Sequence, residues 1–440
     1  MKKIAVFLLS LSMILSLLVA CSSEPSNGSG SNSGESSNTE TQQANGQKVV
    51  LNFWTLFEGG DGEFMQQMID QFNQEHPDIQ VKNTKLAWAE YYTKLITAVS
   101  SGNGPDIGVS HTSKLPDLVN QGVVTELDES AREAGLDWSS FNQNILNATI
   151  YDSKHYAIPI DTHPFILYYN KKLLREAGAL GDDGRPKFDP TPEGFVKFLV
   201  DLKGKLPANV MPFAMANKEH DPFRMWWSFY HQMGGKDIIS DDLKSPAIDM
   251  DKAVKAANYI KDLYHKEQVI KLNDPDFYKT FQSGQAAIMM TGVWATGTWE
   301  KTENFEFGAM PIPALFGKPA TWGDSHTLVL PTQSSEDPEK RKAAVTFANW
   351  IAENGQIWAQ AGHIPSKPSA IEKEEFKKLP YRSDYVIVAD SVAFNKPSDK
   401  NWAIRDNVVF KNLDKVWNNT MSAEDAFKAT HDQLGQLLQQ

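Results

Sequence analysis

Cysteine is nearly absent from this 440-residue sequence, which contains only Cys21. Without a second cysteine the chain cannot form an internal disulfide, so its folded part must be stabilised by a hydrophobic core. Cys21 follows directly on an apolar stretch, residues 4–20, that itself follows Lys2 and Lys3. A positive start followed by an apolar stretch of this length is typical of a secretory signal and is slightly short for a comfortable membrane span.

The junction LVAC, residues 18–21, resembles the bacterial lipobox, in which the signal is cut before the cysteine and the new N-terminal cysteine carries lipid. We therefore expect residues 1–20 to be a signal peptide and Cys21 to be lipidated. The alternative is an uncleaved anchor with an incidental thiol. In either case we expect the body outside the cytoplasm and attached to the membrane. The lipidated protein would stay attached to the membrane, because more than one acyl chain binds a membrane stably whereas a single chain binds it only marginally.

Large apolar side chains are missing from residues 22–47, which contain eight serines, four glycines, four asparagines and three glutamines. Such a tract cannot bury enough apolar surface to offset its chain entropy. We expect a disordered tether with an r.m.s. reach of roughly 25–30 Å. Cys21 and the tether, residues 21–47, would connect the body to the membrane.

Net positive charge is also lacking, because 43 Lys and Arg face 55 Asp and Glu, for a formal net charge of −12. An acidic chain with scattered basic residues argues against nucleic acid or an anionic membrane surface as the ligand. The sequence shows no repeat of solenoid period and no catalytic motif that we can identify.

The body, residues 48–440, is longer than one hydrophobic core usually spans, which favours two domains. Its beginning alternates strand, helix, strand, helix and strand, over residues 48–54, 64–72, 79–81, 91–99 and 106–110. This order predicts a doubly wound parallel α/β lobe, in which ligands bind at the carboxyl ends of the strands. Further helices are expected at residues 191–203, 251–266, 277–285 and 338–353.

Two extended segments are interrupted by proline. Residues 156–174 contain Pro159 and Pro164, and residues 307–314 read FGAMPIPA. Because proline cannot donate to a central ladder, we expect these segments to cross between two lobes. A third crossing is expected after residue 353, before residues 361–370. Three crossings would let two lobes hinge about one cleft.

Five segments of the body resemble the extracellular solute-binding proteins of ABC importers, in the maltose-binding-like group that carries sugars and oligosaccharides. They are FNQEHPDIQV (72–81), YYTKLITAVSSGNGPDI (91–107), YAIPIDTHPFILYYNKKLL (156–174), FQSGQAAIMMTGVW (281–294) and GHIPSKPSA (362–370). The resemblance covers almost the whole body. It implies two α/β lobes, a hinge of crossing strands, a ligand between the lobes, and delivery to a membrane permease.

In this interpretation the N-terminal lobe comprises residues 48–162 and about 312–355, and the C-terminal lobe comprises residues about 163–311 and 356–440. The expected partners are a carbohydrate ligand and the permease subunits, and the expected protein is a monomer that contacts the membrane through its lipid anchor only. It would lie on the extracellular face of the membrane of a Gram-positive bacterium, where no outer membrane retains a free binding protein.

The resemblance also implies ligand-binding positions, most of them on expected loops. They are Thr55, Glu58, Asp61, His111, Thr112, Asp161, His163, Phe223, Trp226, Trp227, Trp294, Trp322 and Asp324. The residue types suit a pyranose, whose C–H face lies against an aromatic plane and whose hydroxyls pair with carboxylates or amides. Aromatic and acidic side chains on loops above the sheets would meet both needs.

Several of these residues have a structural alternative. Of Trp226 and Trp227, neighbours on an expected helix, one should face the core, whereas Trp294 and Trp322 lie near glycines and favour stacking. Asp61 is as well placed to cap the helix that follows it as to contact a sugar. Asp161 could instead form hydrogen bonds at the hinge.

Four histidines, His111, His163, His326 and His363, fall in expected loops near the cleft. They would suit an importer of a divalent metal. None of them, however, forms a tight H-x-x-x-H or Cys/His cluster. A metal site would also have no use for as many as twelve tryptophans. We expect no metal and no cofactor, and assign these histidines to hydrogen bonds with hydroxyls or with a uronate carboxylate.

The alternative from another class is a cell-surface glycoside hydrolase or lyase. Such an enzyme needs two carboxylates roughly 5 to 9.5 Å apart, a distance that sequence does not show. The order of the five segments and the lack of a catalytic motif favour a binding protein over an enzyme. A binding protein for a non-sugar solute is a further alternative.

Overall fold

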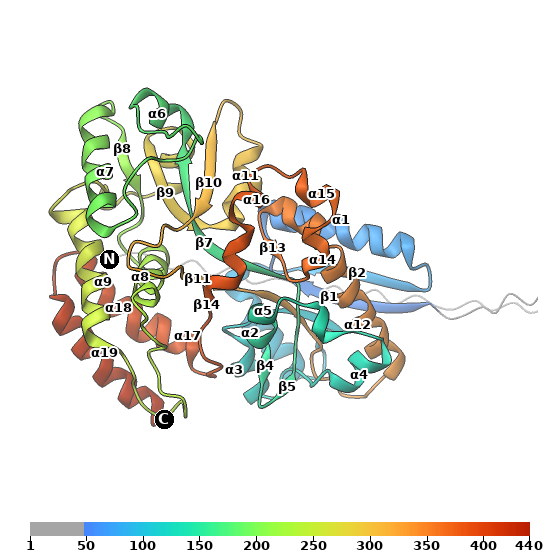
Figure 1. Ribbon diagram of the computed structural model, residues 1–440. Coiled ribbons are helices and arrows are strands. Elements are labelled where there is room, and N and C mark those ends of the chain that lie inside the picture. Colours follow the sequence, from blue (N-terminus) through green and yellow to red (C-terminus); the bar gives the residue numbers. More distant parts are fainter. Residues whose placement is uncertain (1–47) are drawn as a thin grey trace, which may run out of the picture. The chain divides into compact units, whose positions relative to one another are not determined.

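The computed structural model describes residues 48–440. The expected signal peptide, Cys21 and the tether, residues 21–47, lie outside the described residues. The described chain forms two α/β lobes, each built on its own sheet (Figure 1). Within residues 48–440, no helix is long and apolar enough to cross a membrane.

The sheet of the first lobe has the strand order β2-β1-β3-β12-β6. Its strands are β1 (Val49–Thr55), β2 (Ile79–Lys85), β3 (Ile107–His111), β6 (Ile158–Pro159) and β12 (His326–Val329). β1 runs parallel to β2 and β3, and β12 is antiparallel to β3 and β6. The alternation with helices α1 (Gly59–Glu75) and α2 (Trp88–Ser100) confirms the α/β lobe that the sequence predicts.

The sheet of the second lobe is centred on β7 (Asp161–Asn170), in which every residue is buried. Its main order is β14-β11-β7-β9-β8, and β10 and β13 also pair with β7. The other strands are β8 (Met211–Ala214), β9 (Ala286–Gly292), β10 (Phe307–Pro311), β11 (Thr321–Asp324), β13 (Ile364–Pro365) and β14 (Val392–Ala393). A separate hairpin joins β4 (Ile150–Tyr151) to β5 (Lys154–His155).

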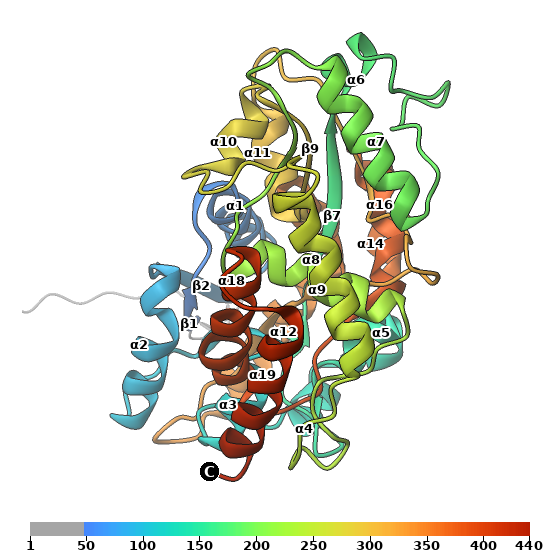
Figure 2. The same cartoon turned by 90° about the vertical axis from the view of Figure 1, so that its left-hand side faces the viewer.

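The long helices cover these sheets. α8 (His220–Gln232), α9 (Met250–His265), α18 (Phe410–Trp417) and α19 (Ala423–Leu438) pack together in the second lobe (Figure 2). α7 (Pro192–Lys205) packs against β8 of that lobe, and α12 (Pro338–Glu353) packs against β1 of the first lobe. α7, α9 and α12 each begin after a Thr or Asp whose side chain accepts a backbone N–H, which satisfies an otherwise unpaired donor.

Short helices occupy the connections. They are α3 (Leu115–Asn120), α4 (Asp128–Glu133), α5 (Gln143–Asn147), α6 (Lys171–Glu176), α10 (Phe277–Gln282), α11 (Thr296–Glu300), α13 (Gly355–Trp358), α14 (Pro368–Ile371), α15 (Glu374–Lys377), α16 (Arg382–Tyr385) and α17 (Asn401–Ala403). Several of them carry residues of the site described below.

The chain passes between the two sheets three times. It leaves the first sheet after Pro159 and enters β7 at Asp161, and it returns at Ser325, between β11 and β12. It leaves again between Trp358, in the core of the first lobe, and Ile364 of β13. The expected second crossing at residues 307–314 is wrong. β10 and β11 both pair with β7, so the chain stays in the second sheet until Ser325, beyond the lobe boundary expected near residue 312.

Candidate functional site

A pocket of about 330 Å³ lies between the two lobes. Residues of the first lobe on its wall are Leu56, Phe57, Glu58, Asp61, Trp88, His111 and His326. Residues from the elements of the second lobe, and from the segments that bridge to them, are His163, His220, Arg224, Trp294, Trp322, Asp324, His363, Trp402 and Arg405. The wall therefore combines indole rings with carboxylates, imidazoles and guanidinium groups.

The structure brings seven of the thirteen sequence-predicted residues to this pocket. They are Glu58, Asp61, His111, His163, Trp294, Trp322 and Asp324. Six do not line it: Thr55, Thr112, Asp161, Phe223, Trp226 and Trp227. Phe223 and Trp227 line an adjoining cavity of about 20 Å³, which shares Trp322, Asp324, Trp402 and Arg405 with the main pocket.

Trp226 is part of the core of the second lobe and does not reach the pocket. Its side chain is fully buried, its indole N–H donates to the Ala253 carbonyl, and its ring stacks on Tyr230 and Phe427. Trp227 is fully buried as well and donates to the Ala393 carbonyl. Because α8 is buried around most of its circumference, both rings pack inside, where the sequence analysis expected only one to do so.

The two predicted threonines support other side chains. Thr55 is buried and its hydroxyl donates to Asn83 at 3.0 Å. Thr112 donates to Asp324 Oδ1 at 2.5 Å, and the Ser113 hydroxyl donates to Asp324 Oδ2 at 2.5 Å. Burial opposes the charge on Asp324, but His111, His163 and these hydroxyl donors lower its pKa. Asp324, from β11, is thereby tied to the first lobe.

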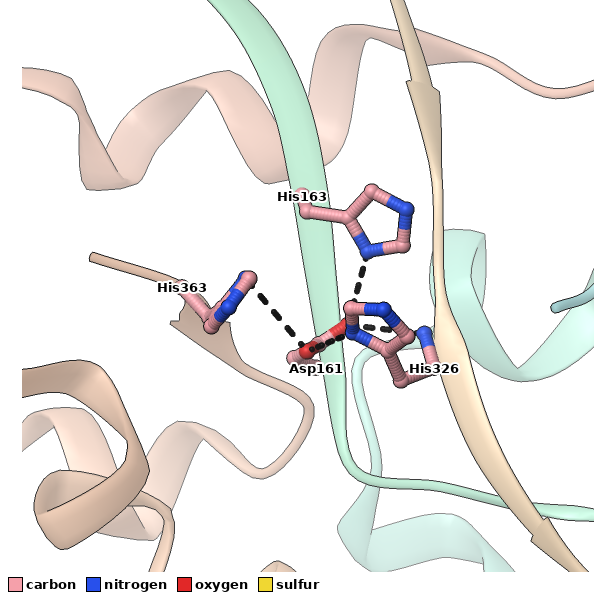
Figure 3. A group of neighbouring side chains, drawn as sticks. All are labelled: Asp161, His163, His326 and His363. Atoms are coloured by element: carbon pink, nitrogen blue, oxygen red, sulfur yellow. Dashed lines mark hydrogen bonds and ion pairs between the residues drawn. The ribbon is translucent and has the colours of Figure 1, made fainter. Parts of the chain in front are cut away.

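Asp161 lies beneath the pocket and holds two histidines (Figure 3). Its Oδ1 accepts the His326 backbone N–H at 2.8 Å and lies 3.2 Å from His163 Nδ1. Its Oδ2 lies 2.8 Å from His326 Nδ1 and accepts the Trp358 indole N–H at 2.7 Å. Burial alone would raise the pKa of Asp161, yet His326, His363 and these donors hold it well below its usual range. These contacts favour the hinge interpretation of Asp161 over direct ligand contact.

The histidines of the wall are packed against one another. The ring centroids of His163 and His326 are 4.2 Å apart, and those of His111 and His326 are 4.9 Å apart. His111 Nδ1 lies 2.7 Å from the Tyr92 hydroxyl. Burial and the neighbouring His326 lower the pKa of His163 to about 4 and that of His111 well below its usual value. Both imidazoles are therefore neutral at pH 7 and can each accept and donate one hydrogen bond.

Asp61 lies in the first turn of α1 and makes no capping hydrogen bond, since the residue before the helix is Glu58. Its Oδ2 lies 3.2 Å from His363 Nε2. Burial opposes the charge on His363, but the carboxylates of Asp61 and Asp161 together raise its pKa.

Arg224 is a wall residue that sequence reasoning missed. Its guanidinium lies 4.8 Å from the Trp294 ring centroid and 4.5 Å from that of Trp322, and Nη1 is 2.5 Å from Asp221 Oδ1. The two indoles expected to stack on a sugar thus hold a guanidinium between them. Arg224 lies in the segment DPFRMWW, from which only aromatic residues were predicted to bind ligand. A prediction that also considered hydrogen-bonding side chains in this segment would have included Arg224.

Trp88, His220, Trp402 and Arg405 were missed as well. Trp88 is 39% exposed and its ring stacks on Trp402 with centroids 5.8 Å apart. The Arg405 guanidinium lies 4.5 Å from the Trp402 ring. Trp402 and Arg405 are three residues apart, a spacing that places both on one side of a helix. This spacing is only a weak sign of a binding site, and it lies outside the five segments that resemble the family.

One group of side chains has the composition of a metal site. Among residues 48–440, Asp161, His163, His326 and His363 each offer one ligand atom, and these four atoms lie within 4.8 Å of one another.

The family model for the bacterial extracellular solute-binding proteins matches residues 67–382. The chain belongs to this family. Of the relatives of this solute-binding protein, the arabinooligosaccharide-binding protein of Bacillus subtilis (strain 168) is 24% identical over 410 residues, which cover 88% of this chain and 85% of the relative.

Two solved structures show the same fold as this solute-binding protein. The GacH receptor of Streptomyces glaucescens GLA.O, solved unliganded and with acarbose, has a TM-score of 0.77 at 20% identity, covering 89% of this chain and 99% of that chain. UgpB from Mycobacterium tuberculosis, in complex with glycerophosphocholine, has a TM-score of 0.77 at 18% identity, covering 89% and 98%. Their ligands differ in chemistry, so the shared two-lobe fold does not by itself name a ligand.

Proposed function

We propose that this solute-binding protein captures a carbohydrate, an oligosaccharide in particular, in the pocket between its lobes and delivers it to an ABC import permease. The observation that carries the proposal is the wall of that pocket. Four indole rings, those of Trp88, Trp294, Trp322 and Trp402, lie there among groups that can bind hydroxyls.

A sugar needs both kinds of surface. Its C–H face gains dispersion and hydrophobic contact with an indole, while its hydroxyls must replace the hydrogen bonds that they lose to water. Neutral His111 and His163 can accept or donate to hydroxyls, and Glu58 can accept from them. The arabinooligosaccharide-binding relative and the acarbose-bound GacH structure support the carbohydrate class.

Binding without catalysis is the second part of the proposal. A glycoside hydrolase needs one carboxyl group as an acid and another as a base or nucleophile. Asp324 is held by Thr112 and Ser113, and its lowered pKa keeps it ionised, which does not suit a general acid. Asp61 lies against His363. The contacts of Asp324 and Asp61 therefore favour ligand capture over bond cleavage.

The attachment and location of the protein follow from the sequence. We propose a lipid at Cys21, a position on the extracellular face of the membrane of a Gram-positive bacterium, and a monomer that meets its permease there. The two lobes would serve as the docking surfaces for the permease, with domain boundaries near the three crossings.

One observation favours an acidic ligand as the second candidate. Arg224 and Arg405 both line the pocket, and guanidinium groups bind carboxylates and phosphates by paired hydrogen bonds. A uronate-containing saccharide would use both the indoles and these cations, and a phosphodiester would use the cations alone.

A thermal-shift screen tests these proposals. The panel contains neutral mono- and oligosaccharides, uronate-containing oligosaccharides, and glycerophosphocholine. A ligand at 100 times its dissociation constant adds about 2.7 kcal/mol to stability. We expect a saccharide to raise the melting temperature, and a rise with glycerophosphocholine alone would overturn the carbohydrate proposal. A reducing-sugar assay on the hits distinguishes stoichiometric binding from turnover, which would instead indicate an enzyme.

A further inference from the structure

Asp161, His163, His326 and His363 meet where the three crossing segments come together, and the three histidines also line the pocket (Figure 3). Asp161 and His163 lie at the start of β7, His326 begins β12, and His363 directly precedes β13. All four side chains are buried, and Asp161 and His363 are fully so. We call these four residues the hinge cluster.

His363 has no hydrogen-bond partner among the described residues, although both of its ring nitrogens are buried. Its Nδ1 is 3.6 Å from Asp161 Oδ2, which is too long for a hydrogen bond. Its Nε2 forms an ion pair with Asp61 Oδ2 at 3.2 Å, so Nδ1 is the ring nitrogen that lacks a partner. A buried polar group without a partner is costly, so its retention at the centre of the fold needs an explanation.

The four ligand atoms of the hinge cluster lie within 4.8 Å of one another, so small shifts of the side chains would bring them to the separations found around a single ion. Asp161 Oδ2 is 2.8 Å from His326 Nδ1 and 3.6 Å from His363 Nδ1, and Asp161 Oδ1 is 3.2 Å from His163 Nδ1. Nitrogen and oxygen ligands that bind one tetrahedral zinc ion at 2.0–2.2 Å are separated from each other by roughly 3.3–3.5 Å. The 3.6 Å distance between His363 Nδ1 and Asp161 Oδ2, which is too long for a hydrogen bond, is therefore close to the separation of two zinc ligands.

We propose that the hinge cluster binds a divalent transition metal ion of the Zn²⁺ class through Asp161, His163, His326 and His363. Three imidazoles and one carboxylate form a donor set that zinc favours. The ion would give His363 Nδ1 the partner that it lacks and would place positive charge beside the Asp161 carboxylate. Each imidazole would release to solvent any proton on the nitrogen that binds the ion, because only a deprotonated nitrogen can bind a metal.

Trp358 supports the site from outside the donor set. Its indole N–H donates to Asp161 Oδ2 at 2.7 Å, and its ring stacks on His363 with centroids 4.7 Å apart and planes 9° apart. Contacts of this kind fix the orientation of metal ligands. An ion here would join the three crossing segments and restrict rotation of the lobes about them. His163, His326 and His363 also line the ligand pocket, but this role does not depend on the proposed sugar, because the ion belongs to the hinge and is not the transported solute.

The test uses the full chain, stripped with a chelator and titrated calorimetrically with ZnCl₂. We expect one Zn²⁺ per chain, proton release that depends on buffer, and a higher melting temperature for the loaded protein. Co²⁺ in place of Zn²⁺ should give the intense visible absorption of a tetrahedral site. A stripped wild-type chain that takes up no Zn²⁺ would overturn the proposal.

Variants assign the ion to the hinge cluster. His363→Gln should weaken Zn²⁺ binding at least about 100-fold, because loss of a ligand exceeds the 10- to 100-fold effect of losing an outer contact. His231→Gln is the matched control, since His231 Nε2 is also buried without a partner but lies outside the hinge cluster, and it should bind Zn²⁺ as the wild type does. Equal affinity in His363→Gln and the wild type would place the ion elsewhere and refute the site.

A second variant keeps the test decisive if His363→Gln does not fold, as judged by its thermal melt. Trp358→Phe keeps an aromatic ring beside His363 and removes only the indole N–H. We expect a loss of Zn²⁺ affinity of about 10- to 100-fold and a shifted Co²⁺ spectrum. An unchanged affinity together with an unchanged spectrum would contradict the proposal.

Discussion

Trp402 donates its indole N–H to the hydroxyl of Ser113, with 2.9 Å between Nε1 and Oγ. Ser113 follows β3 of the first lobe, whereas the residues after Trp402, from Ile404 onward, contribute to the core of the second lobe. The Trp402 ring itself packs against the core of the first lobe. One side chain therefore bridges the lobes at the wall of the pocket.

Trp402→Ala should weaken ligand binding and favour an open arrangement of the lobes. The substitution removes a bridging hydrogen bond and a large apolar contact at the pocket, so we expect an affinity loss on the order of 2 kcal/mol. Small-angle scattering of the liganded protein should give a larger radius of gyration than the wild type. Trp138→Ala, which removes a ring stacked on His155 in the first lobe, is the control and should leave affinity and scattering unchanged.

Trp294→Ala and Trp226→Ala should give opposite patterns. Trp294 lines the pocket, so its loss should reduce affinity by about 2 kcal/mol and change the melting temperature of the empty protein little. Trp226 is fully buried, so its loss should leave a cavity and destabilise the fold by about 3–5 kcal/mol. Calorimetric titration beside a thermal melt distinguishes the two. A large stability loss with normal affinity in Trp294→Ala would remove Trp294 from the site.

Arg224→Met should destabilise the second lobe through Asp221. The Asp221 carboxylate is buried and loses its 2.5 Å partner, which costs about 3 kcal/mol for a buried charge left unpaired. The double variant Arg224→Met/Asp221→Asn removes that charge and should recover most of the loss. Denaturant unfolding of the wild type, both single variants and the double variant measures the coupling, and purely additive effects would show that the pair is not coupled.

The Asp414 carboxyl should make stability fall as the pH rises through the weakly acidic range. Burial raises its pKa to about 6, above its value in the unfolded chain, so the folded state binds the proton more tightly. This contribution is fully present below about pH 4 and is lost as the pH rises through about 6. Because the group is only about half buried, we expect no more than about 1 kcal/mol.

Asp414→Asn tests this contribution. Asp414 Oδ1 accepts the Glu219 backbone N–H at 2.7 Å, and asparagine can keep that hydrogen bond. The variant should lose the decrease in unfolding free energy between about pH 4 and pH 7 that Asp414 supplies. The same pH dependence in the variant and the wild type, by urea unfolding, would assign the effect to other groups.

Cys21→Ser should release the protein from the cell into the medium, because Cys21 is the only cysteine that could carry lipid. The measurement is an immunoblot of the membrane and medium fractions. Membrane association that persists in the variant would contradict lipidation and would favour an uncleaved apolar anchor.

The regular elements were predictable from the sequence because they depend on local patterns. Residues 48–54, 106–110 and 338–353 were expected as two strands and a helix, and β1, β3 and α12 match them within one residue. Apolar periodicity and capping residues act over one or two turns, so they can be read without knowledge of the fold. The order of these elements, with the family resemblance, also indicated two α/β lobes.

Packing in the folded protein decides which side chains line the pocket. Trp226 and Trp227 differ by one position, and the sequence assigned only one of them to the core, whereas α8 is enclosed so that both are buried. Arg224 was not predicted because its place between Trp294 and Trp322 depends on where β9 ends and where β11 begins.

The sequence by itself determined the amphipathic helices, the buried strands and a supply of aromatic and polar residues suited to a cleft, and it predicts export and lipidation at Cys21. Only the tertiary structure decided that the second crossing lies at Ser325 and that His326 and His363 converge on Asp161. The physical reason is that β7 pairs with strands distant in the chain, β11 and β13, and that Ser325 carries the chain from β11 into β12. Such pairings depend on complementary faces across the whole fold, which no local pattern specifies.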